Sequence, residues 1–258
     1  MSRIKNAFKN GKAFIGFVTG GDPTIENTKE FILEMAKAGA DLIEIGIPFS
    51  DPIAEGPVIQ EANNRALCAG ATVEKIFTLT EELRKEIDIP LVFLTYVNPV
   101  YHYASGYDGF FKRCAGAGLD GIIIPDLPFE EQPPFKQAAQ KYGIDIISLI
   151  APTSQERIKE IAKSASGFIY LVSSMGVTGV RNEITTDLSS ITSAIKSVTD
   201  VPVAIGFGIH SPQQAAQMSK IADGVIVGSA IVKLAAKYGK EAAPHIYSYV
   251  KEMKDAVR

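Results

Sequence analysis

One glutamate, Glu44, lies in a segment where an acidic side chain is unexpected. Its neighbours in the run DLIEIGIP are Ile43 and Ile45, and such a run is typical of a strand buried on both faces. An unpaired carboxylate there costs free energy, because burial disfavours its charged form. The same burial raises the pKa of a carboxyl group towards the range useful for general acid–base catalysis. Glu44 is therefore the first candidate catalytic residue.

The alternative for Glu44 is a structural role, in which a buried Arg or Lys neutralises the carboxylate. No Lys or Arg occurs within the eight strands predicted below, which weakens this alternative. Because strongly perturbed carboxylates tend to mark functional sites, we favour catalysis.

Two more acidic residues, Asp51 and Glu55, follow in the segment FSDPIAEGP. Paired carboxylates can divide the roles of acid and base between them. Asp before proline and Glu before glycine are also common in turns, so the pattern leaves both interpretations open for each residue.

Glycine-containing segments follow late strands of the chain, namely Thr178-Gly179, Gly206-Phe207-Gly208 and Gly228-Ser229. In barrels of alternating strands and helices, the loops after the last two strands often hold a phosphate together with a helix N-terminus. Glycine lets backbone N–H groups approach the anion, and the helix dipole favours its charge. These glycines could simply make tight turns, but the three segments together favour phosphate binding.

The sequence lacks the residue patterns that several other kinds of active site require. The histidines His102, His210 and His245 lie far apart and do not show the spacing of a zinc site. No lysine lies within a predicted strand, which disfavours a Schiff-base enzyme, and no GxSxG motif occurs. We therefore expect carboxylates, hydroxyls and backbone dipoles to carry the chemistry, with no metal and no organic cofactor.

The elements that must position these residues follow from short, continuous apolar runs, the pattern of parallel strands covered on both faces. Strands are predicted over residues 13–20, 40–48, 90–97, 119–126, 145–151, 167–174, 201–208 and 223–229. Amphipathic patterns that open on Thr or Ser predict helices between several of them.

Strands that alternate with helices over about 250 residues predict an α/β fold, the (β/α)8 TIM barrel. The alternative, a doubly wound open sheet, is disfavoured because no GxGxxG motif follows the first strand. Proline and glycine are spread along the chain without a polar linker, so we expect one domain over residues 1–258.

The gaps after the second and sixth strands are long, so residues 49–66 and 174–189 are expected to form loops at the C-terminal face of the barrel, where active sites are built. Apolar residues at or beyond strand ends could line a pocket for a flat ligand, although each taken singly is better explained as barrel core. They are Phe17, Ile59, Leu94, Ile123, Tyr170 and Phe207.

Composition excludes several classes of protein. The chain has 258 residues, 46% of them hydrophobic, and its 26 basic and 29 acidic residues give a net charge of −3. This charge disfavours binding to nucleic acid, and this hydrophobicity disfavours disorder. The longest uncharged run, residues 201–219, contains prolines and a histidine and does not predict a membrane span. Two cysteines, Cys68 and Cys114, without CxxC spacing fit free thiols in a reducing cytoplasm.

The run LIEIGIPFSDPIAEGP, from Leu42 to Pro57, resembles the signature of the tryptophan synthase alpha chain family. Further segments are similar to that family in order along the chain. They are FVTGGDP near the N-terminus, IIPDLP around Asp126, GVTG at 176–179, GFGI at 206–209 and GSA at 228–230. The similarity extends from about residue 13 to the C-terminus.

The resemblance implies a barrel lyase that cleaves indole-3-glycerol phosphate into indole and glyceraldehyde 3-phosphate. Glu44 matches the family's catalytic glutamate, which protonates C3 of the indole ring and helps to move a proton in the retro-aldol step. Glu55 stands where the family most often has a catalytic aspartate, which hydrogen-bonds the indole N–H and stabilises the indolenine-like intermediate.

The resemblance also implies binding residues and a partner. Phe17, Ile59, Tyr170 and Phe207 would sandwich the indole, Thr178 and Gly179 would close over the substrate, and Gly179, Gly208, Gly228 and Ser229 would hold the phosphate. Ser174 and Met175 stand where many members have Arg and Ala. The family's alpha chain carries no cofactor and works with a pyridoxal-phosphate beta chain, typically in an α2β2 complex.

Two rival functions stay open. Another phosphate-binding barrel enzyme of amino-acid biosynthesis would need a catalytic Lys or an Asp pair at the ends of the first and fifth strands, which here read FVTG and LIAP. A non-catalytic barrel subunit that only binds a phosphorylated ligand is disfavoured by the presence of both Glu44 and Glu55.

Overall fold

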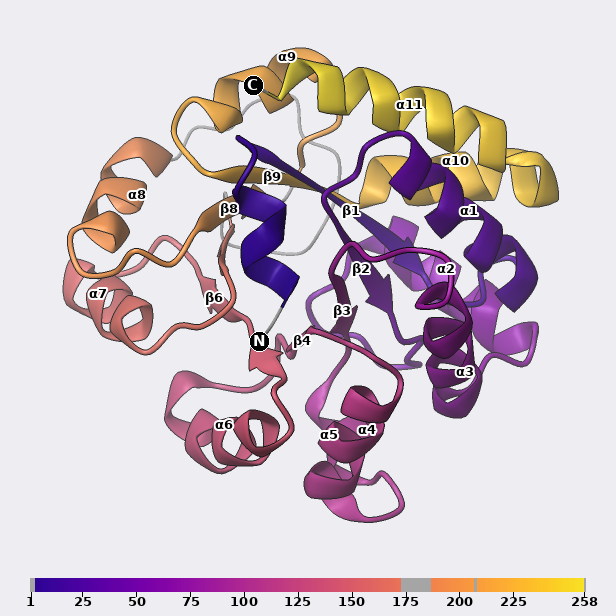
Figure 1. The fold of residues 1–258 in the computed structure, drawn as a ribbon, viewed down its shortest axis with the longest axis horizontal. Coiled ribbons are helices and arrows are strands. Elements are labelled where there is room, and N and C mark those ends of the chain that lie inside the picture. The colour runs from indigo at the N-terminus through magenta and orange to yellow at the C-terminus, as the bar shows by residue number, and fades with distance from the viewer. Residues whose placement is uncertain (1–2, 173–186, 207, 258) are drawn as a thin grey trace.

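The strands form one parallel sheet that closes into a barrel (Figure 1). The computed structural model describes residues 3–172, 187–206 and 208–257. Neighbouring strands follow the order β5-β4-β3-β2-β1-β9-β8-β7-β6, and the pairs are parallel. The strands are β1 (Ala13–Thr19), β2 (Leu42–Gly46), β3 (Leu91–Leu94), β4 (Gly121–Ile123), β5 (Asp145–Ile146), β6 (Ser148–Ile150), β7 (Ile169–Val172), β8 (Val203–Gly206) and β9 (Gly224–Val227).

The barrel closes through a single extended segment that contains both β5 and β6. β5 pairs with β4, β6 pairs with β7, and only Ile147 separates the two. The N–H of Ile147 donates a hydrogen bond to the carbonyl oxygen of Ile122 at 2.8 Å. The predicted (β/α)8 barrel is therefore confirmed, with its fifth strand divided in two, and an open doubly wound sheet is excluded.

Helices surround the barrel (Figure 1). Where the sequence predicts a Thr or Ser cap, the hydroxyl accepts a hydrogen bond from a first-turn N–H, as Thr24 does from Asn27 and Ser211 does from Gln214. The helices are η1 (Arg3–Phe8), α1 (Ile25–Lys37), α2 (Pro57–Cys68), α3 (Val73–Leu83), α4 (Val97–Tyr101), α5 (Gly106–Gly116), η2 (Phe129–Glu131), α6 (Gln132–Lys141), α7 (Gln155–Lys163), α8 (Leu188–Lys196), α9 (Pro212–Ser219), α10 (Ser229–Tyr238), η3 (Gly239–Glu241) and α11 (Ala243–Ala256).

The prediction of a loop over residues 49–66 is wrong beyond Gly56, because helix α2 begins at Pro57. No side chain caps the start of α2, because its N-cap residue is Gly56. Pro57 is tolerated in the first turn, because a backbone N–H at that position would have no helical acceptor. The segment of residues 47–56, called the β2–α2 loop below, is what connects β2 to α2. Most of the second predicted loop, 174–189, lies outside the described residues, and α8 begins at Leu188.

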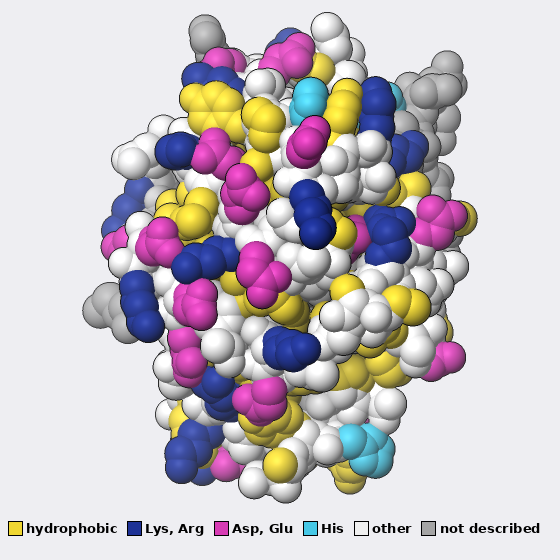
Figure 2. Space-filling view, turned by 90° about the vertical axis from the view of Figure 1, so that its right-hand side faces the viewer, with side chains coloured by type: hydrophobic (Ala, Val, Ile, Leu, Met, Phe, Trp, Pro, Cys, Tyr) yellow, Lys and Arg dark blue, Asp and Glu magenta, His cyan; other side chains and the backbone are white. Residues whose placement is uncertain are grey.

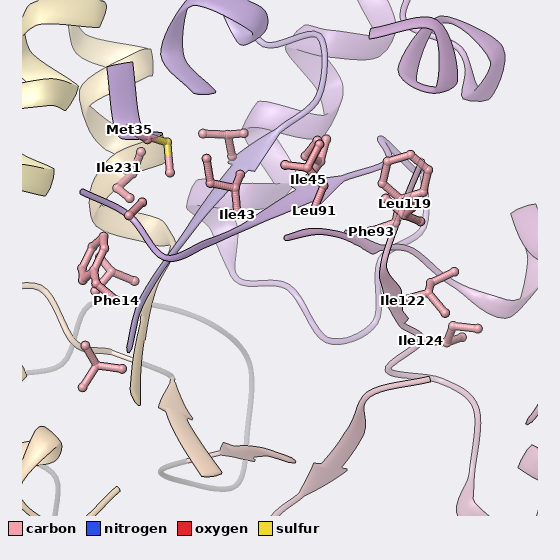
Figure 3. Packing of buried hydrophobic residues seen from close by; sticks show 14 of the residues in the cluster. Phe14, Met35, Ile43, Ile45, Leu91, Phe93, Leu119, Ile122, Ile124 and Ile231 are labelled. Carbon is pink, nitrogen blue, oxygen red and sulfur yellow. The ribbon is translucent and has the colours of Figure 1, made fainter. Parts of the chain in front are cut away.

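The larger part of the core lies between the sheet and the helices. Side chains from the outer faces of the strands, such as Phe14, Ile43 and Phe93, belong to one cluster with helix residues such as Met35 and Ile231 (Figure 3). These side chains are fully buried. Their packing holds the helices against the barrel and fixes the strand ends that carry the site.

A second cluster fills the inside of the barrel and includes Ile15, Leu42, Val92 and Ile226. Successive side chains of a strand point to opposite faces, so residues two apart share a face. Glu44 follows Leu42 by two positions in β2 and therefore faces the barrel interior. The strand that buries Glu44 thus also aims its carboxyl group inwards.

A buried carboxylate, Asp120, ties the N-terminal helix to the start of two strands. It is 3% exposed and accepts hydrogen bonds from Arg3 Nη1 at 3.0 Å, Arg84 Nη2 at 3.0 Å and the N–H of Leu91 at 3.0 Å. The Asp120 carboxylate thus accepts hydrogen bonds from two guanidinium groups and one backbone N–H. Without it, the buried donors among them would lack this partner.

We expect Asp120→Ala to lower the free energy of unfolding by about 3 kcal/mol, because it leaves the largely buried Arg84 guanidinium uncompensated. Urea denaturation measures this change. Asp88→Ala is the matched control, because Asp88 also pairs with Arg3 but is 95% exposed. Equal losses in the two variants would contradict the role given to Asp120.

The surface shows mixed charge. Figure 2 shows Lys and Arg interleaved with Asp and Glu over the helices at the right of Figure 1. In that region Lys29 of α1 pairs with both Glu82 and Glu86. Among the described residues, no helix is long and apolar enough to cross a membrane.

Candidate active site

Glu44 is buried inside the barrel and has a strongly perturbed acidity. Its side chain is 1% exposed, and within the described part of the chain its Oε1 has no hydrogen-bond partner. Burial, and secondly the charge of Glu55, raise the pKa of Glu44 to about 8. None of the described Lys or Arg side chains forms an ion pair with it. A carboxyl group with this acidity can hold a proton near neutral pH and donate it.

Glu55 lies in the β2–α2 loop and is 2% exposed. Its Oε1 accepts a hydrogen bond from the Tyr96 hydroxyl at 3.2 Å, and its backbone carbonyl accepts one from Gln60 Nε2 at 2.7 Å. Because its charge acts on Glu44, the two predicted carboxyl groups lie near each other. Asp51 is exposed at the surface and accepts a hydrogen bond from Ser50, as a turn residue does.

Phe17 and Ile59 form part of an apolar wall beside the carboxyl pair. They belong to one cluster with Ala62 and Val232, against which Leu94 packs. Phe17 is the register partner of Glu44 in the neighbouring strand β1. A side chain at Gly46 would place its Cβ 2.7 Å from Cζ of Phe17, so glycine there leaves room for the ring.

Tyr170 of β7 contributes the opposite side of the site. It is 7% exposed, belongs to the inner cluster together with Ile123, and packs so closely on Gly206 that any side chain there would overlap its ring. Burial, together with the charges of Glu44 and Glu55, raises the pKa of the Tyr170 hydroxyl. Because the charges of Glu44 and Glu55 both act on its hydroxyl, Tyr170 lies near both carboxyl groups.

Three of the predicted phosphate residues, Gly208, Gly228 and Ser229, follow β8 and β9. Gly228 is the N-cap of α10, Ser229 is its first residue, and no side chain caps this helix. A helix start without a side-chain cap leaves N–H groups that can bind an anion. Gly208 has φ of +91°, a conformation that side chains other than glycine rarely adopt. Gly228 also lies against the Phe17 ring, so the start of α10 adjoins the apolar wall.

A sequence profile of tryptophan synthase alpha chains matches residues 4–258. The chain belongs to the tryptophan synthase alpha chain family. The tryptophan synthase alpha chain of Lacticaseibacillus casei is 52% identical over 257 residues, which are 100% of this chain and 96% of that protein. That of Lactiplantibacillus plantarum is 49% identical and covers 100% of this chain and 97% of its own.

Solved structures agree with this membership. Tryptophan synthase subunit alpha from Legionella pneumophila is 34% identical with a TM-score of 0.88, covering 100% of this chain and 98% of that one. A chain of the tryptophan synthase complex from Pyrococcus furiosus is 35% identical with a TM-score of 0.87, covering 95% of this chain and 99% of that one. The resemblance to the tryptophan synthase alpha chain family found in the sequence is confirmed.

Several predicted site residues of this tryptophan synthase alpha chain family member lie outside the described residues: Thr178, Gly179 and Phe207. The structure brings together Glu44, Glu55, Phe17, Ile59 and Tyr170. The sequence analysis missed Tyr96, whose hydroxyl contacts Glu55. Its position at the C-terminal end of a predicted barrel strand was an available signal, because catalytic groups of barrels gather there.

Proposed function

We propose that this chain cleaves indole-3-glycerol phosphate into indole and glyceraldehyde 3-phosphate, with Glu44 and Glu55 as its catalytic residues. The observation that carries the proposal is the buried carboxyl pair, in which burial and the charge of Glu55 raise the pKa of Glu44 to about 8. It occurs in a chain that belongs to the tryptophan synthase alpha chain family along its length.

In the proposed reaction, the Glu44 proton goes to C3 of the indole ring, so that the bond between C3 and the glycerol side chain can break. The resulting Glu44 carboxylate can take the proton of the side-chain hydroxyl as that carbon becomes an aldehyde. The enzyme thus ends each turnover with the proton it began with. Ionised Glu55 would accept a hydrogen bond from the indole N–H and stabilise the positive charge that C3 protonation creates.

Binding residues are proposed from the same geometry. Phe17, Ile59 and Tyr170 surround the carboxyl pair with apolar surface suited to an indole ring. The uncapped start of α10, with Gly228 and Ser229, is suited to the phosphate. Thr178, Gly179, Phe207 and Gly208 complete the predicted set.

We further propose that the indole passes to a tryptophan synthase beta chain. A solved relative is titled the tryptophan synthase a2b2 complex of Pyrococcus furiosus. Two large apolar side chains lie exposed in segments that follow β2 and β3, Ile53 at 72% and Tyr101 at 56%. They lie at the end of the barrel that carries the site, from which the indole would leave. The cytoplasmic location stays a prediction.

The direct test measures indole release from indole-3-glycerol phosphate by absorbance, with and without a beta chain. We expect cleavage by the isolated chain and faster cleavage in the complex. Chelators and borohydride treatment with substrate should leave the activity intact, because the described residues offer no metal-binding cluster and the predicted strands carry no lysine. Phosphate-ligand binding without indole release would instead support the non-catalytic subunit.

We expect Glu55→Ala to slow cleavage roughly tenfold to a hundredfold, the cost of one lost hydrogen bond to a charged group. Glu55→Asp should be far milder, because it keeps the carboxylate. The thermal midpoint should hardly move in either variant, since the Glu55 side chain belongs to none of the apolar core clusters. An active but less stable Glu55→Ala protein would show that Glu55 only shapes the turn before Gly56 and Pro57.

A further inference from the structure

The hydroxyl of Tyr96 lies at a junction of two hydrogen bonds. Tyr96 follows β3, is 2% exposed and accepts a hydrogen bond from the N–H of Ala54 at 3.2 Å. The same hydroxyl donates to Glu55 Oε1 at 3.2 Å. A phenol has a single proton, and because the Ala54 N–H faces its oxygen, that proton is directed to Glu55.

The Tyr96 ring is fixed in the place where it makes these contacts. It stacks on Phe49 with a centroid distance of 5.4 Å and an interplanar angle of 29°. Phe49, Ala54 and Glu55 all belong to the β2–α2 loop, so Tyr96 contacts this loop at three points. The next residue, Val97, donates its N–H to Asp126 Oδ1 at 2.8 Å, which anchors the backbone of Tyr96 to the segment after β4.

A hydrogen bond donated to a carboxylate favours its charged form over its protonated form. The titratable groups that face this region come from several elements: Glu44 from β2, Tyr170 from β7 and Asp126 from the segment after β4. Among the described residues, Glu55 is the one whose charge raises the pKa of Glu44. Two like charges in a buried site disfavour each other, so a group that stabilises charge on one carboxylate leaves the proton on the other.

We propose that Tyr96 is a positioning residue that keeps the negative charge of the carboxyl pair on Glu55 and leaves the proton on Glu44. This inference rests on the proposed function, because it assigns the protonation state in which that reaction begins. A proton on Glu55 would remove the negative charge that faces the indole nitrogen. Loss of the proton from Glu44 would remove the acid that attacks C3.

The test is Tyr96→Phe, which removes the hydroxyl and keeps the ring on Phe49. We expect kcat/KM to fall roughly tenfold to a hundredfold, as for the loss of a hydrogen bond to a charged group. The acid limb of the pH profile should move to higher pH by about one unit, because the Glu55 carboxylate loses a donor that favours its charge. The alkaline limb should stay in place, because at that pH Glu55 is ionised in both proteins and its charge still acts on Glu44. The profile therefore narrows from its acid side.

A second measurement does not depend on turnover. Carbon-13 NMR of protein labelled at the glutamate side-chain carboxyl carbon follows the protonation of each carboxyl group, and Glu44→Gln and Glu55→Gln assign the two signals. In Tyr96→Phe, the Glu55 signal should titrate at higher pH than in the wild type. If the wild-type chain does not cleave indole-3-glycerol phosphate, this titration still tests the role of Tyr96, so the two failures are distinguishable.

Tyr103→Phe is the matched control, because the Tyr103 hydroxyl also donates to a glutamate, Glu74, at the surface. It should leave the pH profile and both assigned signals unchanged. In a Glu55→Gln background, Tyr96→Phe should shift neither limb further, because the carboxylate it acts on is absent. An unchanged Glu55 titration in Tyr96→Phe, or an equal shift in Tyr103→Phe, would overturn the proposal.

Discussion

Replacing Glu44 by glutamine is expected to reduce cleavage of indole-3-glycerol phosphate at least a hundredfold. Glutamine keeps the shape of the buried side chain and loses its exchangeable acidic proton. General acid–base catalysis contributes about 10²–10⁴-fold, and the proposed mechanism uses Glu44 for both proton transfers. The loss should appear in kcat, because the interaction belongs to the transition state, while a non-cleavable substrate analogue should bind as before.

Glu61→Gln is the control for this experiment, because it removes an exposed carboxylate from the neighbouring helix α2. It should retain essentially full activity. More than a tenth of wild-type activity in Glu44→Gln would remove Glu44 from the mechanism and leave the buried carboxyl group without a catalytic role.

The strands and Glu44 could be predicted from the sequence because both depend on local composition. Each barrel strand is buried on both faces, so it appears as a continuous apolar run, and a single carboxylate within such a run is conspicuous. The observed strands are shorter than the predicted ones because the ladder of hydrogen bonds ends before the apolar run does. The division of the fifth strand at Ile147 depends on its two neighbours, β4 and β7, which the local pattern does not contain.

Features that depend on distant contacts could not be predicted in this way. Helix α2 begins without a side-chain cap, so its start lacked the local signal that marked α1 and α9. The hydrogen bond between Tyr96 and Glu55 joins residues from two different strand ends. Asp51 and Glu55 look alike as turn residues, and only the fold buries one and exposes the other.

The buried position of Glu44 should also make the stability of the protein depend on pH. The pKa of Glu44 is raised to about 8 in the folded chain, against a reference value of 4.5. Between these two values the unfolded chain has lost the proton and the folded chain still holds it. Unfolding then releases a proton, so the free energy of unfolding falls as the pH rises, by about 1.4 kcal/mol per pH unit.

The measurement compares wild type and Glu44→Gln by urea denaturation from pH 5 to pH 9. We expect the free energy of unfolding of Glu44→Gln to rise steadily relative to that of the wild type across this range, by on the order of 4 kcal/mol in total, and the difference to level off above pH 8. Titrating groups that do not interact with Glu44 contribute equally in both proteins, so the difference reports Glu44 together with its coupling to Glu55. Glu61→Gln should follow the wild-type curve in parallel. If Glu44→Gln also runs parallel to wild type, then Glu44 is ionised in the folded protein at neutral pH. The carboxyl pair would then lack the proton that the cleavage requires.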